Sequence, residues 1–154
     1  MYNRILVPVD GSPTSERALS EAIRLARLCS GAIRLLHVVD PITHVTGFER
    51  PDIYASRIRP ALLDAGAQLL ARASERVAAA GVPADTALHE SISERVSEVV
   101  VEQARAWGAD LIVIGTHGRR GIDRVLLGSD AEMVVRTSPV PVLLVRASAG
   151  PGTP

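Results

Sequence analysis

Residues 111–121 read LIVIGTHGRRG, and this stretch decides the fold of the chain. Its apolar run, residues 111–114, predicts a buried strand, and the glycines that follow predict a loop. The amphipathic run over residues 130–137 then predicts a helix. A loop that joins a strand to a helix gathers backbone N–H groups at the helix N-terminus, where they can bind phosphate. We therefore predict that this loop binds a nucleotide.

Apolar runs and amphipathic runs alternate along the rest of the chain. Further strands are expected at residues 5–9, 32–39, 84–90 and 142–145, the third of them at a sheet edge because it is more polar. Further helices are expected from Pro13 to about Ser30, from Ile58 to just before Gly81, and over residues 93–107. This alternation predicts one α/β domain with a parallel sheet and right-handed crossovers.

Two segments fall outside this alternation. Residues 40–57 show no period and contain two prolines and a glycine, so we expect a long loop there. Residues 147–154 are small and rich in glycine and proline, and we expect them to form a disordered tail after a domain of residues 1–146.

The position of the binding site follows from the expected sheet. In open parallel sheets, ligands bind beyond the carboxyl ends of the strands, where the strand order reverses. If the first and fourth strands are neighbours at that point, Asp10-Gly11-Ser12 and the loop after Gly115 face the same crevice. The two polar motifs would then form one site.

The composition excludes several classes of function. The chain has 17 basic and 17 acidic residues and only 3% aromatic residues, which argues against binding to nucleic acid or to an anionic membrane surface. All 17 basic residues are arginines, so a Walker-type phosphate loop, a protein kinase and a pyridoxal phosphate enzyme, which each need a lysine, are excluded. We see no signal peptide and no apolar stretch of membrane-spanning length, and expect a cytoplasmic protein.

The glycines of the loop form a longer pattern, G-x2-G-x9-G-[S/T], which Gly115, Gly118, Gly128 and Ser129 complete. Residues 5–12 read ILVPVDGS and residues 139–145 read PVPVLLV. Together these segments resemble the universal stress protein family, over residues 1–146. The resemblance implies a Rossmann-like fold of the adenine nucleotide α-hydrolase type, with strand order 3-2-1-4-5 and two helices on each face. Because the glycine pattern is complete, the chain resembles the branch of the family that binds ATP.

The resemblance also implies a role for each residue that matches the family pattern. Asp10 would contact the ribose or a Mg²⁺ or Mn²⁺ ion beside the phosphates. Three residues, Pro8, Val9 and Val38, would pack around the adenosine. Six residues would surround the phosphates: Gly115, His117, Gly118, Arg119, Gly128 and Ser129. Family members commonly dimerise through the last strand, and an apolar edge from Val140 to Val145 would aggregate if exposed, so we expect a homodimer.

Other interpretations remain open for two of the residues near this loop. Ser129 begins a stretch with the spacing of a capping box, ending at Glu132, so it could cap a helix as well as contact phosphate. His37 lies in an apolar run and fits a hydrogen-bonded core histidine.

Other interpretations also remain open for the whole chain. No residue offers a convincing catalytic base, so we expect a nucleotide-dependent regulatory protein with little or slow ATP hydrolysis. A dimeric interaction module that binds no nucleotide is the alternative. An adenylylating enzyme of the related α-hydrolase type is disfavoured, because its Ser-Gly-Gly-x-Asp-Ser loop has no match in DGSPTS at residues 10–15.

Overall fold

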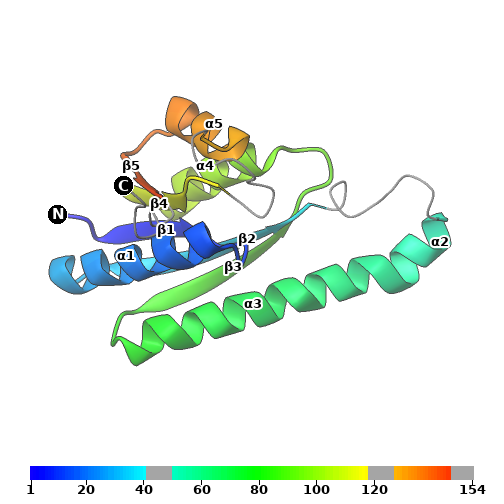
Figure 1. The fold of residues 1–154 in the computed structure, drawn as a ribbon, viewed down its shortest axis with the longest axis horizontal. Helices are drawn as coiled ribbons and strands as arrows, with labels where there is room; N and C mark the ends of the chain where they lie inside the picture. The colour runs from blue at the N-terminus through cyan, green and yellow to red at the C-terminus, as the bar shows by residue number, and fades with distance from the viewer. Residues whose placement is uncertain (41–49, 118–126, 147–154) are drawn as a thin grey trace, which may run out of the picture.

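The computed structural model describes residues 1–40, 50–117 and 127–146 of the 154-residue chain. Within these residues, five parallel strands form one sheet in the order β3-β2-β1-β4-β5 (Figure 1). The strands are β1 (Arg4–Pro8), β2 (Ala32–Val39), β3 (Ala84–Glu90), β4 (Leu111–Gly115) and β5 (Val142–Val145). The expected α/β class, the parallel sheet and the strand order are confirmed.

Helices cover both faces of the sheet, as expected. On one face lie α1 (Pro13–Cys29) and α3 (Arg59–Ala79), and on the other lie α4 (Val96–Trp107) and α5 (Ser129–Thr137) (Figure 1). Two short segments, α2 (Pro51–Ile53) and the π-helical η2 (Tyr54–Ile58), lead into α3. No helix in the described ranges is long and apolar enough to cross a membrane.

Strand β1 shows why the central strands are apolar throughout. Ile5 and Val7 belong to the core between the sheet and helices α1 and α3, whereas Leu6 belongs to the core under α4 and α5. All three side chains are fully buried. A parallel sheet with helices on both faces buries both sides of its strands, which produces continuous apolar runs in the sequence.

The ends of α1 match the signals in its sequence. The Ser12 hydroxyl accepts a hydrogen bond from the backbone N–H of Ser15 at 3.3 Å, and Pro13 occupies the first helical position. At the other end Ser30 adopts the left-handed conformation, with φ of 54°, and Gly31 follows it. These local signals therefore define the helix without reference to the remainder of the fold.

The expected loop over residues 40–57 is wrong in its second half. Residues 51–58 are helical, with Pro51 at the first helical position, and they continue into α3. The pattern of the sequence does not reveal this helix because none of these eight residues is buried, so no apolar period is needed. Residues 41–49 and the expected tail, 147–154, lie outside the described residues.

Helix α4 begins at Val96, three residues later than residue 93, where we expected it to begin. The carbonyl of Glu94 accepts a hydrogen bond from the Ser91 hydroxyl, which holds residues 91–94 in a turn. Arg95 is the N-cap residue, and its backbone N–H donates to the Glu98 carboxylate at 3.0 Å. The helix thus starts where the Glu98 carboxylate can accept a hydrogen bond from a backbone N–H at the helix N-terminus.

Candidate functional site

The reversal of strand order lies between β1 and β4, which pair directly. The carboxyl ends of these strands and of β2 open into a cavity of about 440 Å³. This volume lies in the range of roughly 300–1,000 Å³ that is typical of small-molecule pockets. The residues that line it come from all three strands and from the four long helices. The two polar motifs that we expected to face one crevice, at residues 10–12 and after β4, therefore do line the same cavity.

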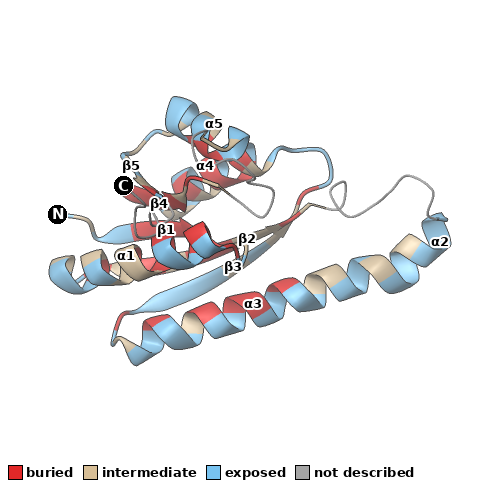
Figure 2. Ribbon diagram, in the orientation of Figure 1, coloured by how far each residue is buried: buried red, intermediate tan, exposed pale blue. Residues whose placement is uncertain are grey.

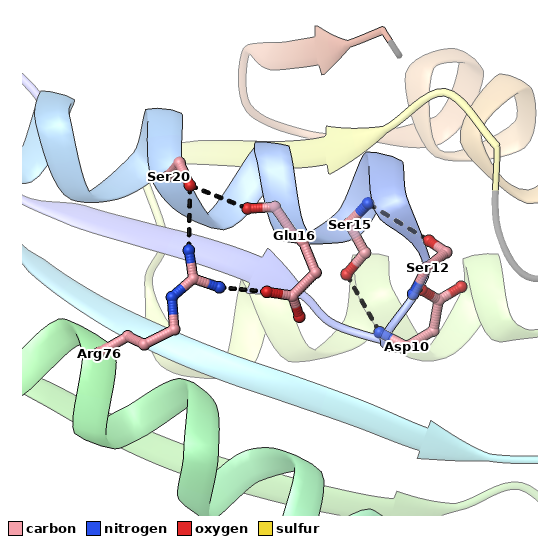
Figure 3. Close-up of polar contacts among 6 residues, drawn as sticks. All are labelled: Asp10, Ser12, Ser15, Glu16, Ser20 and Arg76. Atoms are coloured by element: carbon pink, nitrogen blue, oxygen red, sulfur yellow. Dashed lines mark hydrogen bonds and ion pairs between the residues drawn. The ribbon is translucent and has the colours of Figure 1, made fainter. Parts of the chain in front are cut away.

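The end of β1 brings Pro8, Val9 and Asp10 to the cavity wall. The backbone N–H of Val9 donates to the carbonyl of Leu36 at 2.8 Å, which fixes the end of β1 against β2. The Asp10 carboxylate accepts from the backbone N–H of Ser12 at 2.8 Å, and the Asp10 N–H donates to the Ser15 hydroxyl at 3.2 Å (Figure 3). Asp10 is therefore held in place at the N-terminus of α1.

Gly115 ends β4 at a point where the chain touches the first turn of α1. A Cβ atom on Gly115 would lie 2.7 Å from the Thr14 hydroxyl oxygen and 2.8 Å from the Thr14 carbonyl carbon. The Thr14 hydroxyl also donates to the carbonyl of His117. Gly115 thus has a structural function, because only glycine allows this close approach of strand and helix.

His117 is one of the residues that line the cavity. The Nδ1 atom lies 3.0 Å from the hydroxyl of Thr116, which is itself buried. The Nε2 atom is buried from solvent and has no hydrogen-bond partner among the residues that the structure describes. A buried polar atom without a partner is costly, so this nitrogen is suited to bind a polar group of a ligand.

The N-terminus of α5 also opens into the cavity, but its capping differs from our expectation. The N-cap residue is Gly128, with no side-chain cap, and Ser129 is the first residue of the helix, so the expected capping box is wrong. Gly128 donates to the carbonyl of Thr116 at 2.7 Å, and this contact fixes where the helix begins. Ser129 and Asp130 line the cavity and are both exposed.

The part of the cavity lining that belongs to the core under α4 and α5 is apolar. Val38, which we expected at the adenosine, lies here beside Leu36 of the same strand. The side chains that complete this part come from α4, β4 and α5: Val96, Val100, Ile114, Ala131 and Val134. Such a surface suits a flat, largely apolar group such as a nucleobase.

Sequence analysis missed the contribution of His37 and of helix α3. His37 lines the cavity, and its Nδ1–H donates to the carbonyl of Val9 at 2.7 Å, so it is half-buried and hydrogen-bonded but not inside the core. Its ring packs against Gly66 of α3, where a Cβ would come within 2.8 Å of the ring. Leu62 and Ala65 of α3 also line the cavity. No local pattern links these residues, because β2 and α3 meet only in the folded chain.

The described lining residues carry more negative than positive charge. They include the carboxylates of Asp10, Asp40 and Asp130 and no arginine. Gly118 and Arg119, two of the residues expected at the phosphates, lie outside the described residues. No cluster of three metal-binding side chains occurs in the described part of the chain. The three carboxylates would repel a phosphate group at this site, and a cation beside the phosphate would offset that repulsion.

Comparisons with known proteins agree with this fold. The sequence model of the Universal stress protein family matches residues 1–146. Universal stress protein YxiE of Bacillus subtilis is 32% identical over 151 residues, covering 95% of this chain and all of the relative.

Solved structures agree as well. A universal stress protein family structure from Burkholderia pseudomallei is 34% identical with a TM-score of 0.75, covering 95% of this chain and 97% of that one. A universal stress protein crystallised in complex with cAMP is 25% identical with a TM-score of 0.69, covering 96% of this chain and 99% of that one.

Proposed function

This chain belongs to the universal stress protein family, and from that premise we propose that it binds ATP, with Mg²⁺ or Mn²⁺, in the cavity between the ends of β1 and β4. The observation that carries the proposal is the convergence of the β1 end, the glycine-flanked β4 end and the N-terminus of α5 on one cavity. The complex of a family member with cAMP supports an adenine nucleotide as the ligand class. We propose that the protein lies in the cytoplasm and that the bound nucleotide regulates its interaction with a protein partner.

Each expected residue keeps its role in this proposal. Val38 lies in the apolar part and, with Pro8 and Val9, packs around the adenosine. Asp10 contacts the ribose or the metal ion. The phosphate-binding set comprises Gly115, His117, Gly118, Arg119, Gly128 and Ser129.

Charge at the cavity supports a divalent cation in the complex. Three carboxylates line the described part of the cavity, and they would repel a triphosphate. Mg²⁺ is commonly bound by one or two carboxylates together with substrate phosphates, and does not need a cage of protein ligands. Asp10, which is fixed by the N-terminus of α1, is the residue that we propose as the metal ligand.

Binding is favoured over catalysis because phosphoryl transfer needs a positioned nucleophile and a base or water-orienting group. The carboxylate of Asp10 accepts a hydrogen bond from Ser12, and the Nδ1–H of His37 donates to Val9. These hydrogen bonds hold the two side chains in place within the site. We therefore propose at most slow hydrolysis of the bound ATP.

One observation favours a second function, an interaction module that binds no nucleotide. Gly115 packs against Thr14, and a Cβ on Gly128 would lie 2.9 Å from the carbonyl oxygen of Thr116. Packing alone therefore accounts for two of the motif glycines. In this case the cavity would serve no ligand and the protein would act through its surface.

Calorimetric titration of nucleotide-free protein with ATP and Mg²⁺ separates the two functions. Binding by the wild type, lost in Gly118→Val, supports the nucleotide-binding function. The control is Gly81→Val, which strains a turn outside the cavity lining, because φ at Gly81 is 72°; it should lose stability and keep ATP binding. A folded wild type that binds no ATP contradicts the proposal and favours the interaction module.

We also propose that the protein forms a homodimer through residues 140–145. Strand β5 lies at an edge of the sheet, and Leu143 is 38% exposed. Pairing with a second copy across a two-fold axis would cover this edge and prevent aggregation. Analytical ultracentrifugation that shows a monomer at micromolar concentration would contradict the dimer.

A further inference from the structure

Helix α3 and the segments before it extend beyond the packed body of the protein. The buried residues of α3 begin at Gly66 and continue to Val77. Residues 51–65, which we call the overhang, contain no buried residue (Figure 2). Segments with few buried contacts open locally at low free-energy cost, so the overhang should be among the least stable described helical parts.

The overhang nevertheless forms part of the cavity wall. Leu62 and Ala65 line the cavity from α3, together with residues that follow β1 and β2. Any opening of the overhang would therefore widen the proposed nucleotide site.

An ion pair connects the overhang to the sheet. Arg59 donates from Nε and from Nη2 to the two carboxylate oxygens of Glu90, each at 2.6 Å. Glu90 is the last residue of β3, and its side chain is only 22% exposed. Other side-chain hydrogen bonds of the overhang, such as those of Asp52 with Arg50 and of Asp64 with Gln68, join residues that are close along the chain. By contrast, the packed half of α3 is joined to α1 where Arg76 contacts Glu16 and Ser20 (Figure 3).

The position of Glu90 links this ion pair to the cavity. Glu90 pairs with Val39 in the sheet, and the next residue, Ser91, donates its N–H to the carbonyl of Val39 at 2.9 Å. Val39 and Asp40 line the cavity. The pair thus joins the wall formed by the overhang to the wall formed by the end of β2. Its two parallel hydrogen bonds fix the relative orientation of the two groups as well as their separation.

We propose that Arg59 and Glu90 are positioning residues that hold the overhang closed against the sheet and thereby set the affinity of the cavity for ATP. The effect on affinity rests on the proposed function, whereas the effect on the overhang does not. If the closed state is populated only in part, the apparent affinity for ligand falls by that fraction.

Two measurements test this, hydrogen exchange of residues 51–65 without nucleotide and calorimetric titration with ATP and Mg²⁺. Arg59→Gln should speed exchange of the overhang about two- to fivefold, as for a partly exposed ion pair, and weaken ATP binding by at most the same factor, because affinity follows the closed fraction. The matched control is Arg50→Gln, which removes a pair with Asp52, at 3.1 and 3.2 Å, that does not reach the sheet. This control should leave both measurements unchanged.

Charge reversal distinguishes an effect of the lost ion pair from an effect of general destabilisation of the fold. Arg59→Glu alone should speed exchange further, and the double variant Arg59→Glu with Glu90→Arg should restore slow exchange and ATP affinity in part. Unchanged exchange in Arg59→Gln overturns the proposal, and so does faster exchange with unchanged ATP affinity. A wild type that binds no ATP refutes the proposed function and the effect on affinity together, while exchange still decides whether the pair holds the overhang.

Discussion

Replacing Gly115 with alanine should disturb the point where β4 meets the N-terminus of α1. The new Cβ would lie 2.7 Å from the Thr14 hydroxyl oxygen, 2.8 Å from the Thr14 carbonyl carbon and 2.9 Å from the Thr14 Cβ. Two of these three atoms cannot move by a side-chain rotation, so the strand or the helix must shift. The contact between the Thr14 hydroxyl and the carbonyl of His117 should be lost with this shift.

The size of the effect follows from known cases of overpacking, which cost about 1–3 kcal/mol in the free energy of unfolding. For a chain of this length, each kcal/mol lowers Tm by roughly 2–4 °C. We therefore expect Tm to fall by about 2–12 °C in Gly115→Ala, measured by thermal unfolding followed by circular dichroism. ATP affinity should fall as well, because the shift moves His117 in the proposed site.

Gly31→Ala is the matched control. Its Cβ would lie 2.7 Å from the carbonyl oxygen of Tyr2, an equally close approach to backbone, but at the amino end of β2, away from the cavity. This variant should lose comparable stability and keep its ATP affinity. A change in unfolding free energy below about 0.5 kcal/mol, the usual spread of neutral surface changes, in Gly115→Ala would refute the steric argument. Equal losses of ATP affinity in both variants would show that the loss reflects stability alone.

Three further predictions address the histidine, the ion pair and the dimer. His117→Ala should weaken binding of ATP roughly ten- to hundredfold and leave binding of adenosine unchanged. His117→Gln, whose amide can still form a hydrogen bond, should retain part of the ATP affinity. Calorimetric titration with ATP and with adenosine checks both expectations. The hydrogen bonds from Arg59 hold the pKa of the Glu90 carboxyl below its usual range. The pair therefore stabilises the overhang at neutral pH, and this stabilisation is lost as the pH falls through the lowered pKa. Hydrogen exchange of the overhang should be faster in Glu90→Gln than in the wild type at neutral pH, and the two exchange rates should become equal in acid. Leu143→Arg should dissociate the proposed dimer in sedimentation experiments. It should cost little stability because Leu143 is exposed, whereas a change at Leu144, which packs partly against the core, would also disturb the fold.

Local sequence patterns were sufficient for most of the elements. Residues 32–39 and 142–145 were predicted as strands with the bounds that the structure has, because strands of a covered parallel sheet are continuous apolar runs. Ser12 and Pro13 defined the start of α1, since capping depends only on neighbouring residues. The glycine spacing and the end of β1 also indicated that the site lies between β1 and β4.

The tertiary structure alone determined how the walls of the cavity are built. Gly115 must be a glycine because of Thr14, and His37 lies at the cavity because Gly66 leaves room for its ring. Residues 51–57, which are helical, were predicted as a loop, since they bury nothing and so have no apolar period. The sequence by itself determines structure where the interacting groups are close along the chain or where burial imposes a repeating pattern. Contacts between residues that are far apart leave no such pattern, and only folding brings these residues together.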